Sequence, residues 1–232
     1  MKPTSERVAG LAVVPLITTV GFYILPVHWR SNLYVQFIPQ LSAYLALGLW
    51  GCSNTHLACK LGLELHKIRH GIKWGLLTGM FLGCLNTVII LSMVPALGGD
   101  ITFLRDTPHA KIPFWVMMPW CIICIAATVE LNFRGFLLGR LVNFWTTTLS
   151  TYCLSSKRSP QSWVLLPLLL SAITFSFDPF MVATFGSLHW IAVWDGLIWG
   201  WIWIRMTNLY AVITAHAIEV IILYLAVRSA LL

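Results

Sequence analysis

Charged residues are scarce in this chain. Asp, Glu, Lys and Arg make up only 10% of its 232 residues, whereas an ordinary soluble domain carries about 25%. Hydrophobic residues make up 58% of the chain, and the mean hydropathy is +0.81. The shortage of charge excludes an ordinary soluble domain, so we expect an integral, multi-pass membrane protein folded as one compact bundle.

Other features are missing as well. The sequence has no internal repeat and no low-complexity segment, and without an inverted repeat a transporter that uses polar residues as a relay is disfavoured. The first apolar run is not followed by a small-residue cleavage site and a soluble domain, so we expect no cleaved signal peptide. The net charge of +7 comes from basic residues in short loops. These predict contact with lipid head groups and no nucleic-acid partner.

Long apolar runs predict an all-α membrane bundle, since a spanning helix needs about 20 mainly apolar residues. We expect seven spans, at 8–27, 33–59, 74–98, 112–133, 163–177, 180–204 and 208–227. The fifth and sixth are separated by Asp178-Pro179, and one long kinked element is the alternative for this region. The chain then divides into two N-terminal spans, residues 1–59, and a core, residues 60–232.

Two segments between the spans are predicted to lie at the membrane surface. Residues 60–73, KLGLELHKIRHGIK, carry Leu and Ile on one face and Lys and Arg on the other. That pattern is typical of an amphipathic interfacial elbow helix. Residues 134–162 mix basic residues with Ser and Thr and predict a surface or half-buried helix. With a cytoplasmic N-terminus, 11 of the 15 Lys and Arg residues lie on the cytoplasmic side and four on the other, as the positive-inside rule requires.

Several ionisable residues fall inside or beside these apolar runs, where each costs at least ~2.5–3.5 kcal/mol at the helix centre and indicates function. Glu130 and Arg134 are spaced i, i+4, so they share a helix face and can pair. A salt bridge at the membrane end explains that spacing equally well. Asp195 is interpreted as a helix-end or lumen-facing acid balanced by Arg205.

Two histidines and a second glutamate complete the candidate site. His189 follows Phe185 by four residues, and His216 and Glu219 share one face of the last span at i, i+3. A carboxylate and a histidine together can activate a water, and a second histidine can stabilise the oxyanion formed at a carbonyl. Alternatively, Glu130, His189 and His216 could bind a divalent metal, since imidazole and carboxylate suit zinc or iron. Otherwise no cofactor is expected.

Three fragments in this order resemble the CPBP family of intramembrane proteases, which includes CAAX-prenyl endopeptidases and bacteriocin-processing enzymes. Glu130–Leu137 read ELNFRGFL, similar to the family's EExxxR motif continued as RGFL. Phe185–His189 match its FxxxH motif, and His216–Val220 lie where it has HxxxN. The resemblance covers residues 60–227. It implies peptide-bond hydrolysis at the membrane by a water held between a carboxylate and His189, with His216 stabilising the oxyanion.

Two positions depart from the family pattern. Val129 stands where the family has its first Glu, which activates the water with the FxxxH histidine, and Val220 stands where it has the oxyanion-binding Asn. Loss of a general base costs about 10²–10⁴-fold in rate, and loss of an oxyanion donor about 10²–10³-fold. Glu219, which the family pattern lacks, could supply a carboxylate in their place, or it could pair with Arg228 near the membrane surface.

The sequence therefore predicts a membrane peptidase of the CPBP type with impaired activity. In that case its catalytic residues are Glu130, Arg134, His189, His216 and Glu219, and its partners are the lipid bilayer and a membrane peptide substrate. The alternative is an inactive homologue that serves as a scaffold, assembly factor or fixed subunit of a membrane complex. The 12 Trp residues could then contact partner helices or pigment-like ligands, although Trp is also common at membrane interfaces.

Overall fold

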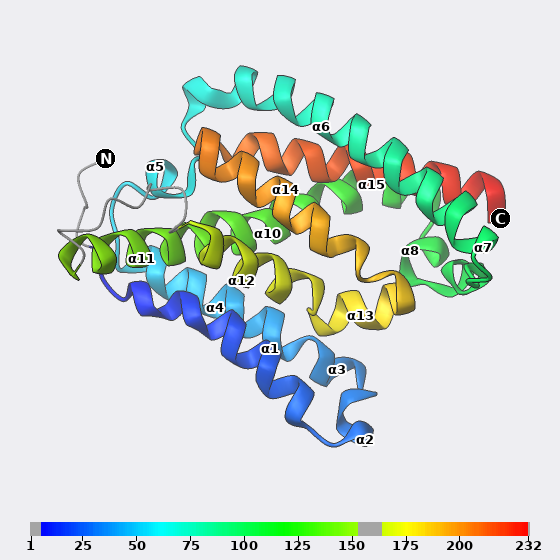
Figure 1. The fold of residues 1–232 in the computed structure, drawn as a ribbon, viewed down its shortest axis with the longest axis horizontal. Coiled ribbons are helices and arrows are strands. Elements are labelled where there is room, and N and C mark those ends of the chain that lie inside the picture. The colour runs from blue at the N-terminus through cyan, green and yellow to red at the C-terminus, as the bar shows by residue number, and fades with distance from the viewer. Residues whose placement is uncertain (1–5, 153–163, 232) are drawn as a thin grey trace.

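The computed structural model describes residues 6–152 and 164–231. Throughout these two ranges the regular structure is helical and no strand is present. The prediction of an all-α bundle is confirmed (Figure 1). In chain order the α-helices are α1 (Val14–Ile24), α2 (Val27–Arg30), α3 (Leu33–Gln36), α4 (Ile38–Cys52), α5 (Leu57–Leu61), α6 (Ile68–Val88), α7 (Val94–Ala96), α8 (Pro108–Lys111), α9 (Phe114–Val116), α10 (Ile122–Glu130), α11 (Gly139–Tyr152), α12 (Leu165–Ser176), α13 (Pro179–Phe185), α14 (Ile191–Met206) and α15 (Leu209–Leu231).

Tighter and wider helical turns join or extend these helices. The 3₁₀ turns are η1 (Ala9–Val13), η2 (Leu65–Lys67), η4 (Thr102–Asp106) and η8 (Gly186–Leu188). The π-helical segments are η3 (Ile89–Met93), η5 (Met117–Cys121) and η6 (Leu131–Leu138). The longest of these, η6, overlaps the ELNFRGFL fragment at residues 131–137. π-helical turns are rare and are often found at functional sites.

The described residues contain three helical regions that are long and apolar enough to cross a membrane: Leu57–Ala96, Ile122–Thr146 and Leu209–Leu231. A fourth candidate is the pair formed by α12 and the helix that begins at Pro179, bent by 54° at the break between them. Residues Ala9–Ile24 form a shorter apolar helix. These lengths support a membrane protein, but they do not confirm seven spans.

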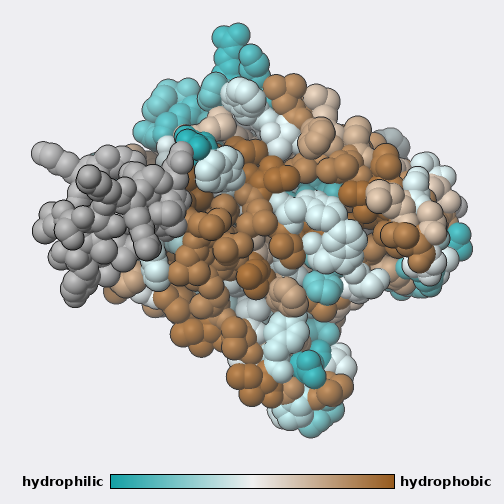
Figure 2. All heavy atoms as spheres, viewed as in Figure 1, coloured by the Kyte–Doolittle hydropathy of each residue, from teal (hydrophilic) through white to brown (hydrophobic). Residues whose placement is uncertain are grey.

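Large apolar side chains cover much of the outer surface of the bundle. On the face drawn in Figure 2 the hydrophobic colour gathers over the middle of the bundle, and hydrophilic atoms gather toward its edges. Monomeric soluble proteins rarely expose apolar patches of more than a few hundred Å², so this surface suits lipid. Outward-facing side chains on four helices include Ile17, Val20, Leu41, Leu45, Leu49, Phe81, Leu85, Leu165 and Ile173.

Helices α6 and α15 pack against each other over much of their length because glycines line one face of α6. The glycines are spaced four residues apart, at Gly71, Gly75, Gly79 and Gly83. A Cβ atom at Gly75 would lie 2.5 Å from the carbonyl oxygen of Ala211, well inside van der Waals contact. Small residues at this spacing let two helix backbones approach within a membrane. This contact holds α15 in place, and α15 carries two of the candidate site residues.

The predicted elbow helix at 60–73 is wrong. The chain makes the short helix α5, turns at Gly62 and begins the long helix α6 at Ile68. Gly62 has φ +75°, and a Cβ there would lie 2.8 Å from the carbonyl oxygen of Thr207. Its own carbonyl accepts a 2.9 Å hydrogen bond from the amide of Leu209. Docking against the turn before α15 therefore breaks the segment, which amphipathic periodicity alone could not reveal.

The predicted surface segment at 134–162 is wrong over its first part. Helix α10 continues through η6 into α11, and most of the side chains from Asn132 to Arg140 are buried. Arg140 forms a 2.7 Å ion pair with Glu6 and lies over the ring of Trp50, 4.4 Å from its centroid. These partners come from distant parts of the chain, so composition could not predict that the arginines are buried. Residues 153–162 lie outside the described residues.

The predicted break at Asp178-Pro179 is present. Asp178 caps α13, where its carboxylate accepts hydrogen bonds from the amides of Phe180 at 3.0 Å and Met181 at 3.4 Å. The single span predicted at 180–204 is wrong, because a second break follows at Gly186, which has φ +51°. Helix α14 begins only at Ile191. His189 lies in this break, between η8 and α14, and is therefore not part of either helix.

Candidate functional site

A cavity of about 380 Å³ lies within the helix bundle. Most of its lining side chains are apolar, but several ionisable residues contribute to the wall, among them His189 in the α13–α14 connection, Asp195 on α14, and His216 and Glu219 on α15. Cavities that are mainly apolar with a few polar groups are typical of binding and active sites. His189 and His216, which are 27 positions apart in the sequence, therefore line the same cavity.

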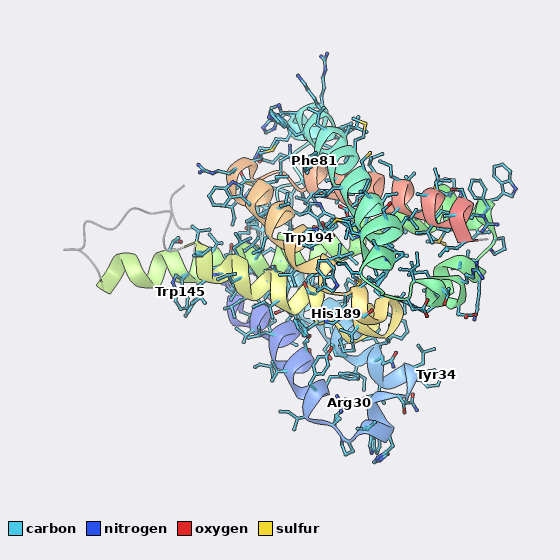
Figure 3. All side chains as sticks on the ribbon, turned by 45° about the vertical axis from the view of Figure 1, so that its right-hand side comes forward. Arg30, Tyr34, Phe81, Trp145, His189 and Trp194 are labelled. Atoms are coloured by element: carbon cyan, nitrogen blue, oxygen red, sulfur yellow. The ribbon has the colours of Figure 1, made fainter. Side chains whose placement is uncertain are left out.

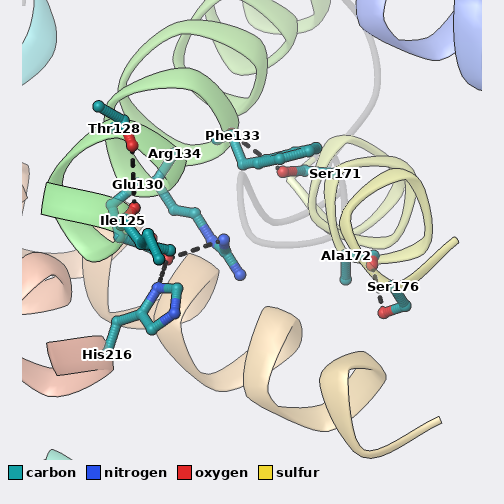
Figure 4. Close-up of polar contacts among 9 residues, drawn as sticks. All are labelled: Ile125, Thr128, Glu130, Phe133, Arg134, Ser171, Ala172, Ser176 and His216. Atoms are coloured by element: carbon teal, nitrogen blue, oxygen red, sulfur yellow. Dashed lines mark hydrogen bonds and ion pairs between the residues drawn. The ribbon is translucent and has the colours of Figure 1, made fainter. Parts of the chain in front are cut away.

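Glu130 and Arg134 form the predicted ion pair. Arg134 Nη1 lies 3.0 Å from Glu130 Oε1, and both residues are completely buried. The same Oε1 atom accepts a hydrogen bond of 2.8 Å from Nδ1 of His216 on α15 (Figure 4). Glu130 does not line the cavity itself but is joined to it through His216. A single carboxylate oxygen therefore links η6 to α15.

The π-helical segment η6 helps to place this pair. Its wider turn leaves backbone groups open, and the carbonyl oxygen of Phe133 accepts a 3.1 Å hydrogen bond from Ser171 on α12 (Figure 4). The guanidinium carbon of Arg134 lies 4.4 Å from the ring centroid of Phe175 and 5.1 Å from that of Trp199. These cation–π contacts add to the ion pair that holds Arg134 in an apolar setting.

His216 has a defined orientation. Its ring stacks on Trp199, with centroids 4.5 Å apart and planes 19° from parallel. An ionised carboxylate only accepts hydrogen bonds, so the contact with Glu130 places a hydrogen on Nδ1. In the neutral ring Nε2 is then the acceptor. Nε2 is therefore the ring nitrogen left for other contacts, and His216 lines the cavity.

His189 is held in a similar way by the backbone. Its Nδ1 lies 2.7 Å from the carbonyl oxygen of Gly186, which can only accept, so Nδ1 again carries the hydrogen. The ring packs edge-on against Phe177, at 5.3 Å between centroids. Figure 3 shows His189 near Trp194 of α14, and the side chain is only partly buried. Among the described residues no hydrogen bond joins it to Glu130, so the two histidines have different partners.

A second polar cluster lies in the same wall. Asn86 Nδ2 on α6 donates to Asp195 Oδ1 at 3.1 Å, to Asp195 Oδ2 at 3.2 Å and to Glu219 Oε1 at 2.7 Å. Trp194 Nε1 donates to Asn86 Oδ1 at 3.1 Å. Asn86 is completely buried, Glu219 is 4% exposed and Asp195 is 5% exposed. This arrangement brings three helices together around one amide.

This cluster differs from the sequence-based interpretation. Asp195 is not balanced by Arg205, which stacks on Trp201 instead. Glu219 binds Asn86 and not Arg228, which donates to the hydroxyl of Tyr224. Sequence analysis missed Asn86 altogether. The available signal was an amide side chain within the apolar run 74–98, which needs a partner when it is buried.

The metal alternative finds no support in the geometry. Across residues 6–152 and 164–231, no three His, Cys, Asp or Glu side chains are arranged to hold a metal ion. Glu130 Oε1 and His216 Nδ1 lie 2.8 Å apart, which is a hydrogen-bonding distance. We therefore interpret the site as an acid–base arrangement.

Comparison of the chain with protein-family models, curated proteins and solved structures finds no match. The site is thus interpreted from its own geometry. Its wall combines a carboxylate-bound histidine, a second histidine whose Nδ1 is bonded to a backbone carbonyl, and a pair of carboxyl groups. Together these groups can take up and give back protons, and the apolar remainder of the wall can accept a hydrophobic segment.

Proposed function

We propose that this protein is a weak intramembrane peptidase in which Glu130 and His216 activate a water. The observation that supports this proposal best is the 2.8 Å contact between Glu130 Oε1 and His216 Nδ1. A carboxylate on Nδ1 sets the ring tautomer, so that Nε2 can take a proton from water as the water oxygen attacks a peptide carbonyl. In this scheme Arg134 is a positioning residue that holds Glu130.

His189 takes the second role in the proposal. When its ring is protonated both nitrogens are donors, so Nε2 can stabilise the oxyanion while Nδ1 remains on Gly186. The family resemblance implies the opposite assignment, with His189 beside the carboxylate and His216 at the oxyanion. We exchange the two roles because Glu130 binds His216. Membership of the CPBP family remains part of the proposal, carried by the three sequence fragments.

The proposed activity is slow because two groups are missing. Val129 and Val220 both line the cavity, at the positions where the family would supply a carboxylate and an amide. Neither side chain can accept or donate a proton, so catalysis depends on Glu130, His216 and His189 alone. The mainly apolar wall suits a hydrophobic peptide segment that reaches the site from the bilayer. Turnover of ~1 s⁻¹ or faster, within the ordinary enzyme range, would contradict this weak activity.

The central test compares His216→Ala with wild type on a membrane-inserted, quenched-fluorescence peptide. Removal of the base is expected to lower kcat/KM at least about tenfold, limited by the slow wild-type rate. The matched control is His70→Ala, since His70 is exposed on α6 away from the cavity. If wild type cleaves no peptide while its fold is intact, the scaffold alternative is favoured, with exposed aromatic side chains such as Trp120 as its contact surface.

For the membrane topology we propose seven spans with a cytoplasmic N-terminus. The start of η1, α5 and the turn between α14 and α15 lie at the left end of Figure 1, and α7, α8 and the end of α15 lie at the right. Basic residues gather at the left end: Lys67 binds the carbonyl of Thr207 at 3.2 Å, and Arg140 binds that of Lys60 at 3.0 Å. The positive-inside rule then favours this end as cytoplasmic.

Cysteine labelling tests that orientation. A membrane-impermeant maleimide should reach Lys67→Cys only from the cytoplasmic side. The control is Lys111→Cys, which should be labelled only from the opposite side, because Lys111 lies at the other end and is 65% exposed. Labelling of Lys67→Cys from the outside alone would overturn the proposed topology without touching the proposed chemistry.

A further inference from the structure

Two buried carboxyl groups meet at one amide nitrogen in the cavity wall. Asp195 on α14 and Glu219 on α15 both accept from Asn86 Nδ2, at distances between 2.7 and 3.2 Å. The indole of Trp194 donates to the amide oxygen of Asn86, which keeps the nitrogen turned toward the carboxyl groups. Asp195 and Glu219 also lie within hydrogen-bonding reach of each other.

Two like charges this close together in an apolar wall repel each other, which favours a pair that shares one proton. The hydrogen-bond pattern indicates where it resides. Both oxygens of Asp195 and Oε1 of Glu219 accept from Asn86, whereas the buried Oε2 of Glu219 has no donor. A proton on Oε2 would make this atom a hydrogen-bond donor, and Asp195 lies within hydrogen-bonding reach of the Glu219 carboxyl group.

The charged groups around Asp195 and Glu219 do not neutralise two negative charges on the pair. The charge of Arg134 interacts with both carboxyl groups, but its guanidinium is bound to Glu130, whose own negative charge also acts on Glu219. His216 lies on the same face of α15, three residues before Glu219, and its Nδ1 is committed to Glu130. With one shared proton the pair carries a single negative charge.

We propose that Glu219, with Asp195 as its proton-sharing partner, is the general acid that protonates the leaving amine of an amide substrate. The proposal rests on the proposed hydrolysis. Two observations carry it: the unpartnered, buried Oε2 of Glu219, and the position of both carboxyl groups in the wall that His216 also lines. Asp195 and Asn86 are positioning residues, since they act through Glu219.

The step balances as follows in atoms and charge. His216 Nε2 takes one proton from water while the water oxygen bonds to the carbonyl carbon, which forms the oxyanion. The oxyanion then collapses and the carbon–nitrogen bond breaks, and the nitrogen takes the proton of Glu219 Oε2. The products are a carboxylic acid and an amine. The carboxylic acid product then ionises. Its proton and the proton on His216 make two: one reprotonates Glu219 Oε2, and the other is released to solvent.

The test compares two substrates that share one acyl group, a peptide amide and a nitrophenyl ester. An amide nitrogen must be protonated to leave, whereas nitrophenolate leaves without a proton. Glu219→Gln is expected to lower kcat/KM for the amide at least about tenfold and to leave the ester within about twofold. The control is Glu64→Gln, because Glu64 pairs with Lys67 outside the cavity. For both substrates the kcat/KM of this variant should stay near that of wild type.

Three outcomes separate the two proposals. If Glu219→Gln lowers kcat/KM equally for the amide and the ester, the role of Glu219 is structural and the general-acid proposal is overturned. If neither substrate changes, the proposal is overturned as well. If wild type cleaves neither substrate, or His216→Ala leaves both unchanged, the proposed function fails and the general acid fails with it. Asp195→Asn should change the amide-to-ester ratio in the same direction as Glu219→Gln, but less.

An infrared measurement tests the shared proton without any turnover. Folded wild type in detergent should show a carboxylic-acid C=O band at neutral pH that is lost in Glu219→Gln. A band that persists in Glu219→Gln and disappears only in Asp195→Asn would place the proton on Asp195 and would overturn Glu219 as the general acid. The absence of any such band in wild type would show that the pair is doubly ionised, and would overturn the proposal.

Discussion

Replacement of Glu130 by Gln is expected to lower the free energy of unfolding by about 3–5 kcal/mol, the usual cost of removing one partner of a buried ion pair. Glu130 and Arg134 are completely buried. Arg134 Nε and Nη2 already lack hydrogen-bond partners, so Glu130 Oε1 is the acceptor that compensates its charge. A neutral amide would leave Arg134 as an uncompensated charge among apolar side chains.

The loss should also loosen His216, whose Nδ1 is bonded to the same oxygen. Thermal unfolding of the purified variant in detergent measures the change, and abundance in the membrane gives a second readout. The matched control is Glu64→Gln, which removes one partner of a partly exposed pair with Lys67. Ion pairs at such exposed sites contribute little to stability, so that variant should unfold as wild type does.

A double variant separates charge from packing. Replacing Glu130 and Arg134 together by Met removes both charges, and buried ion pairs replaced by apolar residues are often neutral in stability. The double variant should therefore be more stable than Glu130→Gln alone. Glu130→Gln protein with wild-type stability but no activity would contradict this prediction, and it would make the role of Glu130 purely chemical.

Val129→Glu is expected to raise peptide cleavage by about 10²-fold, the lower end of the usual contribution of a general base. Val129 is half-buried and lines the cavity, together with His189 and His216. A carboxylate at this position can accept a proton from water and can partner His189, which has no carboxylate of its own among the described residues. Cleavage of the quenched-fluorescence peptide measures the gain.

The matched control for this gain is Val129→Gln, because a Gln side chain has the same shape as Glu but cannot accept a proton at neutral pH. If both variants gain equally, the effect comes from a wider or wetter cavity and not from the new base. Burying a further carboxyl group carries a desolvation cost, so thermal unfolding of each variant must accompany the rate. Val129→Glu that folds normally and shows no gain would contradict the prediction.

The sequence by itself determined the features that depend on local spacing and composition. Low charge and long apolar runs identified a helical membrane protein, because backbone groups in lipid must be satisfied within each segment. The i, i+4 spacing of Glu130 and Arg134 predicted their ion pair, since residues four apart share a helix face. The rigid Pro179 after Asp178 predicted the break between α12 and α13.

Only the tertiary structure decided which faces of different helices meet. Periodicity shows which residues share a face of one helix, but the rotation of α15 against α6 is set by how its side chains fit the row of glycines that includes Gly75. This packing brings His216 to Glu130 across 86 residues of sequence and Glu219 to Asn86 across 133. The close helix approach, not any local pattern, therefore pairs each carboxyl group with its partner.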